Sequence, residues 1–260
     1  MLGHTRLRLP PPGRLPVTGP VDAIDGYYKL GYGTIMRQRL RWALQAMPPR
    51  RLDCVLEIGY GSGVFQYELA RRAAASVGID IHPLGAVVRE RLADDGVHVT
   101  PIQGDGSRLP FADSSFDAVV IVSALEFVPD PAECLRESLR VLRVGGRLVG
   151  IVPRQLVWAD RVYKMLAGFD PETEFAGGRA RVHAALADVL PNARLANRPA
   201  WLPSALAPYE LLSYNVLERE VRPPTRVGDT ARRQSPAAGT GAPPRAPVLP
   251  DLSALRSNQV

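Results

Sequence analysis

Lysine is almost absent from this chain of 260 residues. Lys29 and Lys164 are the only two, so arginine carries nearly all of the positive charge behind the net charge of +6. Such a composition fits a GC-rich genome, and it also fits an acidic partner such as nucleic acid or an anionic membrane surface. Basic residues are not interleaved with stacking aromatics, which argues against nucleic acid as that partner.

Cysteine and long apolar runs are also scarce. The two cysteines, Cys54 and Cys134, fall in apolar patterns and cannot form a disulfide framework, so we expect buried, reduced thiols and a cytoplasmic protein. No apolar stretch approaches the roughly 18 residues of a membrane-spanning helix. The first residues lack the apolar segment of a secretory signal. We therefore expect neither a transmembrane segment nor a secretory signal.

Composition divides the chain into three parts. Residues 1–20 are rich in proline and glycine and are expected to be flexible. Residues 222–260 hold prolines, glycines and arginines with few large apolar side chains, which predicts a disordered tail. Between them we expect one domain over residues 21–221, with its core motifs at 52–153 and a substrate-side region at 154–221.

Apolar runs that indicate strands alternate with helical patterns through the core of this domain. The expected strands are 53–58, 76–80, 97–102, 116–122 and 146–152, and the expected helices are 64–73, 84–95 and 132–142, after a first helix within 21–47. Further along, helices are expected at 158–168 and 179–190, a strand at 193–199 and a strand or short helix at 209–217. The alternation predicts an α/β fold whose parallel sheet is covered by helices on both faces.

A glycine-rich loop follows the first expected strand. The strand ends in Glu57, glycines stand at Gly59, Gly61 and Gly63, and a helical pattern begins directly afterwards. A strand, a glycine loop and a helix in this order are typical of a nucleotide-type site at the carboxyl edge of a parallel sheet. Asp80 ends the next strand, where a carboxylate can accept hydrogen bonds from both ribose hydroxyls.

The residues after these glycines separate the candidate ligands. The dinucleotide fingerprint needs a small residue where this chain has Val64 or Gln66, depending on the starting glycine, so a nicotinamide oxidoreductase is disfavoured. The observed E-x-G-x-G-x-G pattern instead resembles motif I of the class I S-adenosylmethionine (SAM)-dependent methyltransferases. Segments 103–111, 115–123, 125–130 and 139–149 resemble later motifs of the same family, in the same order.

The resemblance implies a fold and a cofactor. It implies a Rossmann-like, doubly wound, mostly parallel seven-stranded sheet, with the last two strands as an edge hairpin within residues 193–217. It also implies SAM as cofactor and S-adenosylhomocysteine as product. The cofactor-binding residues that it implies are Glu57, Gly59, Tyr60, Gly61, Gly63, Asp80, Ile81, Asp105, Gly106 and Ser123.

The resemblance gives a role to each of these residues except Tyr60. The glycines let the backbone approach the methionine and ribose portions, Glu57 orders the loop, and Asp80 binds the ribose hydroxyls. Ile81 lies against the adenine face and Asp105, with the Gly106 backbone, contacts the adenine edge. Ser123 lies beneath the methionyl part.

The acceptor side is less defined in the sequence. We expect in-line methyl transfer to a small-molecule or lipid-like acceptor, with RNA or protein methylation, or a SAM-binding pseudoenzyme, as alternatives. Phe127 stands where quinone and sterol methyltransferases often carry histidine, so no catalytic base is assigned, although Glu126 could face the substrate. Metal ligands are not expected either, because no spacing supplies several of them. Two groups of residues have two interpretations each. An apolar acceptor pocket or packing in the core is expected for Trp158, Tyr163, Met165, Leu166 and Phe169. An aromatic lid or attachment of the first helix to the core is expected for Tyr27, Tyr28 and Tyr32.

Overall fold

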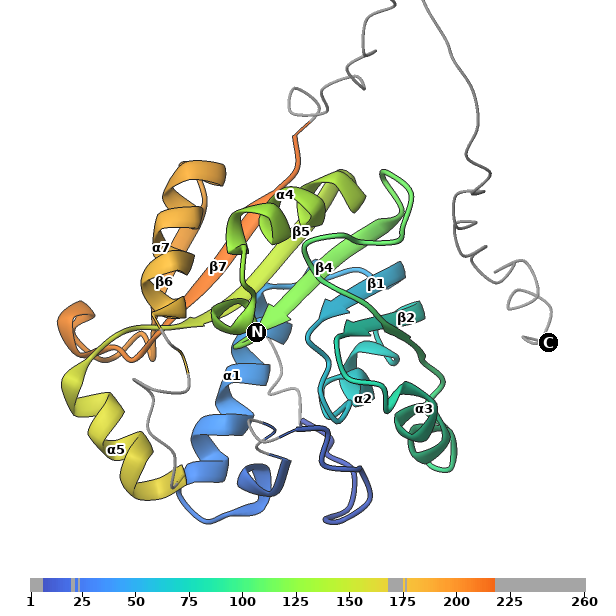
Figure 1. Ribbon diagram of the computed structural model, residues 1–260, viewed down its shortest axis with the longest axis horizontal. Helices are drawn as coiled ribbons and strands as arrows, with labels where there is room; N and C mark the ends of the chain where they lie inside the picture. Colours follow the sequence, from blue (N-terminus) through green and yellow to red (C-terminus); the bar gives the residue numbers. More distant parts are fainter. Residues whose placement is uncertain (1–6, 20–21, 23, 168–174, 176, 218–260) are drawn as a thin grey trace, which may run out of the picture.

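The computed structural model describes residues 7–19, 22, 24–167, 175 and 177–217 (Figure 1). Its centre is a seven-stranded sheet in the order β3-β2-β1-β4-β5-β7-β6. Strands β1 to β5 pair in parallel, and β7 pairs antiparallel with both β5 and β6. The strands are β1 Leu52–Ile58, β2 Ala73–Asp80, β3 Thr100–Gln103, β4 Phe116–Val122, β5 Leu142–Pro153, β6 Arg194–Arg198 and β7 Tyr209–Asn215. The Rossmann-like sheet expected from the sequence is confirmed, including its edge hairpin.

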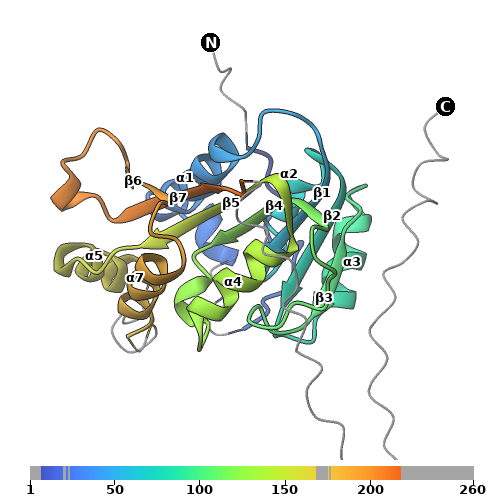
Figure 2. The ribbon, with the colours of Figure 1, turned by 90° about the horizontal axis from the view of Figure 1, so that it is seen from above.

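Helices cover both faces of this sheet, and Figure 2 shows α1 and α4 on opposite sides of it. The helices are α1 Tyr32–Ala46, α2 Gln66–Leu69, α3 Gly85–Ala93, α4 Pro131–Val141, α5 Val157–Ala167 and α7 Gly178–Val189. Short 3-10 turns lie at η1 Ile24–Tyr28, η2 Leu125–Phe127 and η3 Ser204–Leu206. None of the helices in the described ranges is long and apolar enough to cross a membrane.

The core is split in two by the sheet because alternate strand residues point to opposite faces. On one face Val55, Val120 and Ile151 pack with apolar residues of α1 and α3. On the other face Leu56 and Ile121 pack with apolar residues of α4 and α7. Both cysteines are buried, free thiols, as expected, and burial raises the pKa of Cys54 to about 11.

Several element boundaries differ from those expected. The helix expected at 64–73 is limited to Gln66–Leu69, because the chain is already in β2 from Ala73. Strand β5 begins at Leu142 instead of residue 146, since the α4 helix passes directly into it. Within the described residues, the interval between β3 and β4 contains no helix.

The N-terminal segment differs from the flexible chain expected over residues 1–20. Its described part, 7–19, has no regular secondary structure but packs on the domain: Leu15 is buried, the Arg8 amide donates to Glu68, and Arg14 pairs with Asp95 at 3.1 Å. The burial of Leu15, the hydrogen bond to α2 and the ion pair to the turn after α3 hold this segment on the domain despite its low periodicity. Residues 1–6 and the expected tail 222–260 lie outside the described residues.

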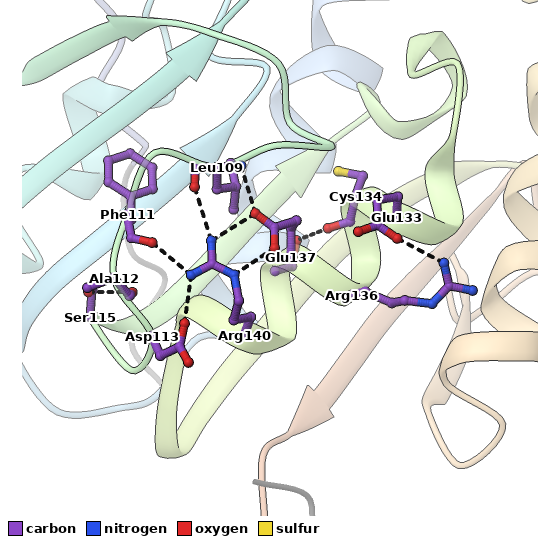
Figure 3. A network of polar contacts seen from close by, with 11 residues as sticks. Leu109, Phe111, Ala112, Asp113, Ser115, Glu133, Cys134, Arg136, Glu137 and Arg140 are labelled. Carbon is purple, nitrogen blue, oxygen red and sulfur yellow. Dashed lines mark hydrogen bonds and ion pairs between the residues drawn. The ribbon is translucent and has the colours of Figure 1, made fainter. Parts of the chain in front are cut away.

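One arginine of α4 fastens the loop between β3 and β4 (Figure 3). Arg140 donates to the carbonyl oxygens of Leu109 and Phe111, at 3.0 and 2.8 Å, and pairs with Asp113 at 2.8 Å. Glu137, one turn earlier on α4, pairs with Arg140 and accepts from the Leu109 amide at 2.8 Å. The network therefore fixes an irregular loop whose first residues lie at the carboxyl edge of the sheet.

Candidate active site

A cavity of about 700 Å³ opens at the carboxyl ends of β1, β2 and β4. The strand order reverses between β1 and β4, and ligands of open α/β sheets bind at such a switch point. Nearly all of the cofactor-binding residues expected from the sequence line this one cavity: Glu57, Gly59, Tyr60, Gly61, Asp80, Ile81, Asp105, Gly106 and Ser123. The exception is Gly63.

The three glycines after β1 occupy different environments. Gly61 has φ +50°, and a Cβ there would meet only the Thr18 hydroxyl, 3.9 Å away, so open space lies above its backbone. Gly63 has φ +87°, and a Cβ there would crowd Val88 at 2.8 Å and Leu92 at 3.1 Å. Gly61 therefore leaves room in the cavity, whereas Gly63 lets the loop pack closely against α3.

The end of β2 holds this glycine loop in place. Asp80 Oδ2 accepts a hydrogen bond from the Gly61 amide at 2.9 Å. His82 contacts the Gly61 carbonyl through Nε2 at 3.0 Å, and its Nδ1 accepts from the Leu84 amide at 3.1 Å. Because Nδ1 accepts a hydrogen bond, the neutral imidazole carries its hydrogen on Nε2. This Nε2–H group donates a hydrogen bond to the Gly61 carbonyl oxygen. The carboxylate and the imidazole together fix both polar groups of Gly61.

Glu57 lies beneath the loop, buried to 3% exposure. The Gln66 side-chain amide donates to it at 2.8 Å, and Gln66 in turn accepts from Ser76 at 2.6 Å. Burial raises the pKa of Glu57 to about 8. The hydrogen bond from Gln66 lowers this pKa, and the negative charge of Asp80 raises it. Tyr60 beside it packs its ring on Gly78 of β2, and burial also raises the pKa of its phenol.

Two further groups form the end of the cavity that faces β3. Ile81 follows Asp80 with a side chain that is 76% exposed at the cavity mouth. Asp105 accepts from the Ser107 amide at 2.8 Å, which closes a tight turn. A Cβ on Gly106 would crowd Ile58 at 2.8 Å, so the turn lies close against the end of β1.

The opposite wall comes from α1, whose Arg39 and Met36 were not among the residues expected at the site. Arg39 is 8% exposed, lines the cavity, and donates through Nη1 to Ser123 Oγ at 2.9 Å. Met36, one turn earlier, lines the cavity as well. The apolar residues of α1 recur at helical spacing, and Arg39 falls at a position of the same face as Met36 and Ala43. This spacing was the sequence signal that Arg39 would be buried.

Aromatic side chains surround the remaining space. Tyr27, Tyr32, Phe127 and Phe175 line the cavity, and the rings of Phe127 and Phe175 lie 5.3 Å apart. Tyr28, which was grouped with the other two tyrosines, does not line it and donates to the Pro10 carbonyl instead.

The described residues of α5 do not form the acceptor pocket that was expected there. Trp158 and Met165 are 40% and 75% exposed and do not line the cavity, because α5 presents them to solvent. Phe169 and the side chains of Tyr163 and Leu166 lie outside the described part. Across the described ranges no group of His, Cys, Asp and Glu is arranged to hold a metal ion.

Glu126 is a further acidic residue of the cavity wall. It belongs to η2, directly after β4, and is only 2% exposed. Among the described residues neither of its carboxyl oxygens has a hydrogen-bond partner. Burial raises the pKa of Glu126 to about 7, against the effect of its own backbone amide and the attraction of Arg39 and Arg179.

Comparison with known proteins agrees with this geometry. Residues 56–150 match the family described as a methyltransferase domain. Demethylmenaquinone methyltransferases from Mycolicibacterium vanbaalenii and Mycobacterium sp. strain KMS are 39% and 43% identical over 128 residues, which is 49% of this chain and 53% and 52% of theirs. The chain thus spans about half the length of the curated relatives it matches.

Solved structures extend the likeness of fold beyond the matched domain. Geranyl diphosphate C-methyltransferase from Streptomyces coelicolor superposes with a TM-score of 0.53 at 15% identity, over 77% of this chain and 87% of that one. A SAM-dependent methyltransferase from Aquifex aeolicus gives 0.51 at 15% identity, over 72% and 100%. Residues 56–150 thus match a methyltransferase domain, and the chain shares the fold of these solved methyltransferases.

Proposed function

We propose that the chain binds SAM in the cavity at the β1–β4 switch point and transfers its methyl group to a small, largely apolar acceptor. The observation that carries the proposal is the open space above Gly61 beside the Asp80 carboxylate. A carboxylate next to an exposed glycine backbone suits a ribose with a chain attached to it. The exposed side chain of Ile81 at the cavity mouth offers an apolar surface to an adenine ring.

SAM supplies a methyl group already activated by its sulfonium, which an acceptor nucleophile displaces in line. The protein then has to hold two reactants at near-attack distance, and such positioning can account for about 7–11 kcal/mol of a barrier. The fixed glycine loop holds one side of the cavity. Arg39, Phe127 and Phe175 bound the other side and are placed to hold the acceptor.

A small acceptor is favoured over a macromolecule by the form of the site. The cavity of about 700 Å³ lies within the range of small-molecule sites, roughly 300–1,000 Å³, and aromatic residues form part of its wall. The relatives named for demethylmenaquinone make a quinone-like acceptor a reasonable first choice. Aromatic walls also suit the flat, apolar ring of such a compound.

The experiment is a methyl-transfer assay with SAM labelled in its methyl group. Acceptors are 1,4-naphthalenediol, dodecylamine, total transfer RNA and a lysine-rich protein, with Asp80→Ala as the control. We expect label in the naphthalenediol alone, and none in the Asp80→Ala reaction. Label in RNA or protein would refute the small acceptor. SAM binding without transfer to any of the four would favour a SAM-binding pseudoenzyme.

A further inference from the structure

The Glu126 carboxyl is an unsatisfied group inside the protein. It is 2% exposed, and neither oxygen has a hydrogen-bond partner within the described ranges. A buried polar group without a partner is costly, and in native proteins such a group calls for a specific explanation. Its place in the wall of the cavity suggests that the missing partner is a bound molecule.

Two arginines act on this carboxyl through their charge. Arg39 of α1 and Arg179 of α7 both favour its charged form. Arg179 is held by Asp160 of α5, with contacts of 2.6 and 3.1 Å, and its guanidinium lies 4.9 Å from the centre of the Phe175 ring. Because burial outweighs these charges, both protonation states of Glu126 are populated near neutral pH.

Arg39 gives the same region a permanent positive charge. Its guanidinium stays protonated at every working pH, lines the cavity, and reaches Ser123 at the end of β4. A cation beside a group that can take up a proton favours an acceptor that becomes an oxyanion when it reacts. The rest of this wall is apolar or aromatic, with Met36, Phe127 and Phe175.

We propose that Glu126 takes a proton from a hydroxyl group of the acceptor while Arg39 stabilises the oxyanion that remains, so that the acceptor is a phenol or an enol. The inference rests on the proposed methyl transfer. Glu126 lines the cavity, and no side chain in the described ranges holds its carboxyl by a hydrogen bond. The acceptor O–H bond breaks and its proton passes to a Glu126 oxygen. The acceptor's electron pair forms the bond to the methyl carbon, and the pair of the breaking carbon–sulfur bond stays on the sulfur of S-adenosylhomocysteine.

The test compares Glu126→Gln with Glu133→Gln, a half-exposed glutamate of α4 that pairs with Arg136. Glu126→Gln keeps the shape and removes a buried charge, so we expect it to fold. With 1,4-naphthalenediol as acceptor, its kcat is expected to fall about 100-fold or more. The increase in wild-type kcat from about pH 6 to about pH 8 is expected to disappear in this variant. Glu133→Gln should match the wild type.

The affinity for SAM, measured by calorimetry, separates this inference from the proposed function. Glu126→Gln should bind SAM as the wild type does. A wild type that does not bind SAM would refute the proposed function itself. The proton-acceptor role is overturned if Glu126→Gln keeps the wild-type kcat and pH profile, or if a SAM-binding wild type methylates no hydroxyl compound, including 1,4-naphthalenediol, 4-nitrophenol and catechol.

Discussion

The Gly61 amide donates a hydrogen bond to Asp80 Oδ2 across 2.9 Å, so the residue expected to bind ribose also holds the glycine loop. Replacing Asp80 by alanine removes both interactions. We expect Asp80→Ala to weaken SAM binding at least about tenfold, since a hydrogen bond to a charged group contributes roughly 1.5–3 kcal/mol. Asp80→Asn keeps an acceptor for Gly61 and should lose less. Calorimetric titration measures both.

The control for this series is Asp188→Ala. Asp188 is an exposed carboxylate of α7 that pairs with Arg136 at 3.1 Å and does not line the cavity. It should bind SAM with wild-type affinity. Equal affinities for Asp80→Ala and the wild type would remove Asp80 from the site.

Substitution of the loop glycines Gly61 and Gly63 by alanine should have different effects on stability and on SAM affinity. Gly63→Ala places a methyl group against Val88 and Leu92 at a positive φ, so we expect a loss of about 1–3 kcal/mol in the free energy of unfolding. Gly61→Ala has open space around its new methyl group and should lose less stability but more SAM affinity, because the methyl group fills part of the cavity. Urea unfolding and calorimetry of both variants provide the comparison.

Gly96→Ala is the matched control, because Gly96 has φ +72° with nothing near its Cβ position. It reports the strain of a positive φ alone. If Gly63→Ala costs no more stability than Gly96→Ala, crowding against α3 is not the reason for that glycine.

The stability of the protein without ligand should depend on the protonation of Glu57. Its folded-state pKa of about 8 lies above the ordinary value of 4.5, so the folded protein binds more protons than the unfolded chain between these values. Stability therefore falls as the pH rises through this window. Glu57→Gln removes this contribution. The difference in free energy of unfolding between this variant and the wild type should therefore shift in favour of the variant as the pH rises from about 5 to about 8.

Urea unfolding at several pH values measures this difference. Glu126 contributes in the same direction, but it is present in both proteins and its effect cancels in the comparison. Parallel pH profiles for Glu57→Gln and the wild type would show that Glu57 keeps an ordinary pKa.

The Arg140 network should contribute to stability through backbone contacts. Arg140→Met leaves the carbonyl oxygens of Leu109 and Phe111 without this donor, and we expect a loss of about 1–3 kcal/mol in the free energy of unfolding. Arg136→Met is the control, because Arg136 is half-exposed on the same helix and its ion pairs lie at the surface. It should change stability by less than about 1 kcal/mol. Equal losses would contradict a special role for Arg140.

The sequence predicted the strands better than the walls of the cavity. Strands such as β1 and β4 are buried on both faces, so their continuous apolar runs are visible in the sequence. Glu57, Asp80 and Ser123 lie at or near strand ends, and parallel strands bring such positions to one edge of the sheet. Local pattern and topology, together with the resemblance to a known family, therefore predicted most of the residues at this edge of the sheet.

The rest of the site depends on packing between distant segments. In the sequence, Arg39 is one of several arginines that alternate with apolar residues. Only the packing of α1 on the sheet brings it to Ser123, which is 84 positions away in the chain. The outward orientation of Trp158 and Met165 depends on how α5 packs, which their apolar spacing does not specify. Short peripheral helices have few local constraints, so tertiary contacts decide which face they bury.

The most direct test of the account is calorimetric titration of the wild-type chain with SAM, S-adenosylhomocysteine and NADH. We expect micromolar binding of the two sulfur ligands and no binding of NADH, because Val64 and Gln66 stand where a dinucleotide site needs a small residue. A folded protein that binds neither sulfur ligand, or that binds NADH as tightly, would contradict the central claim.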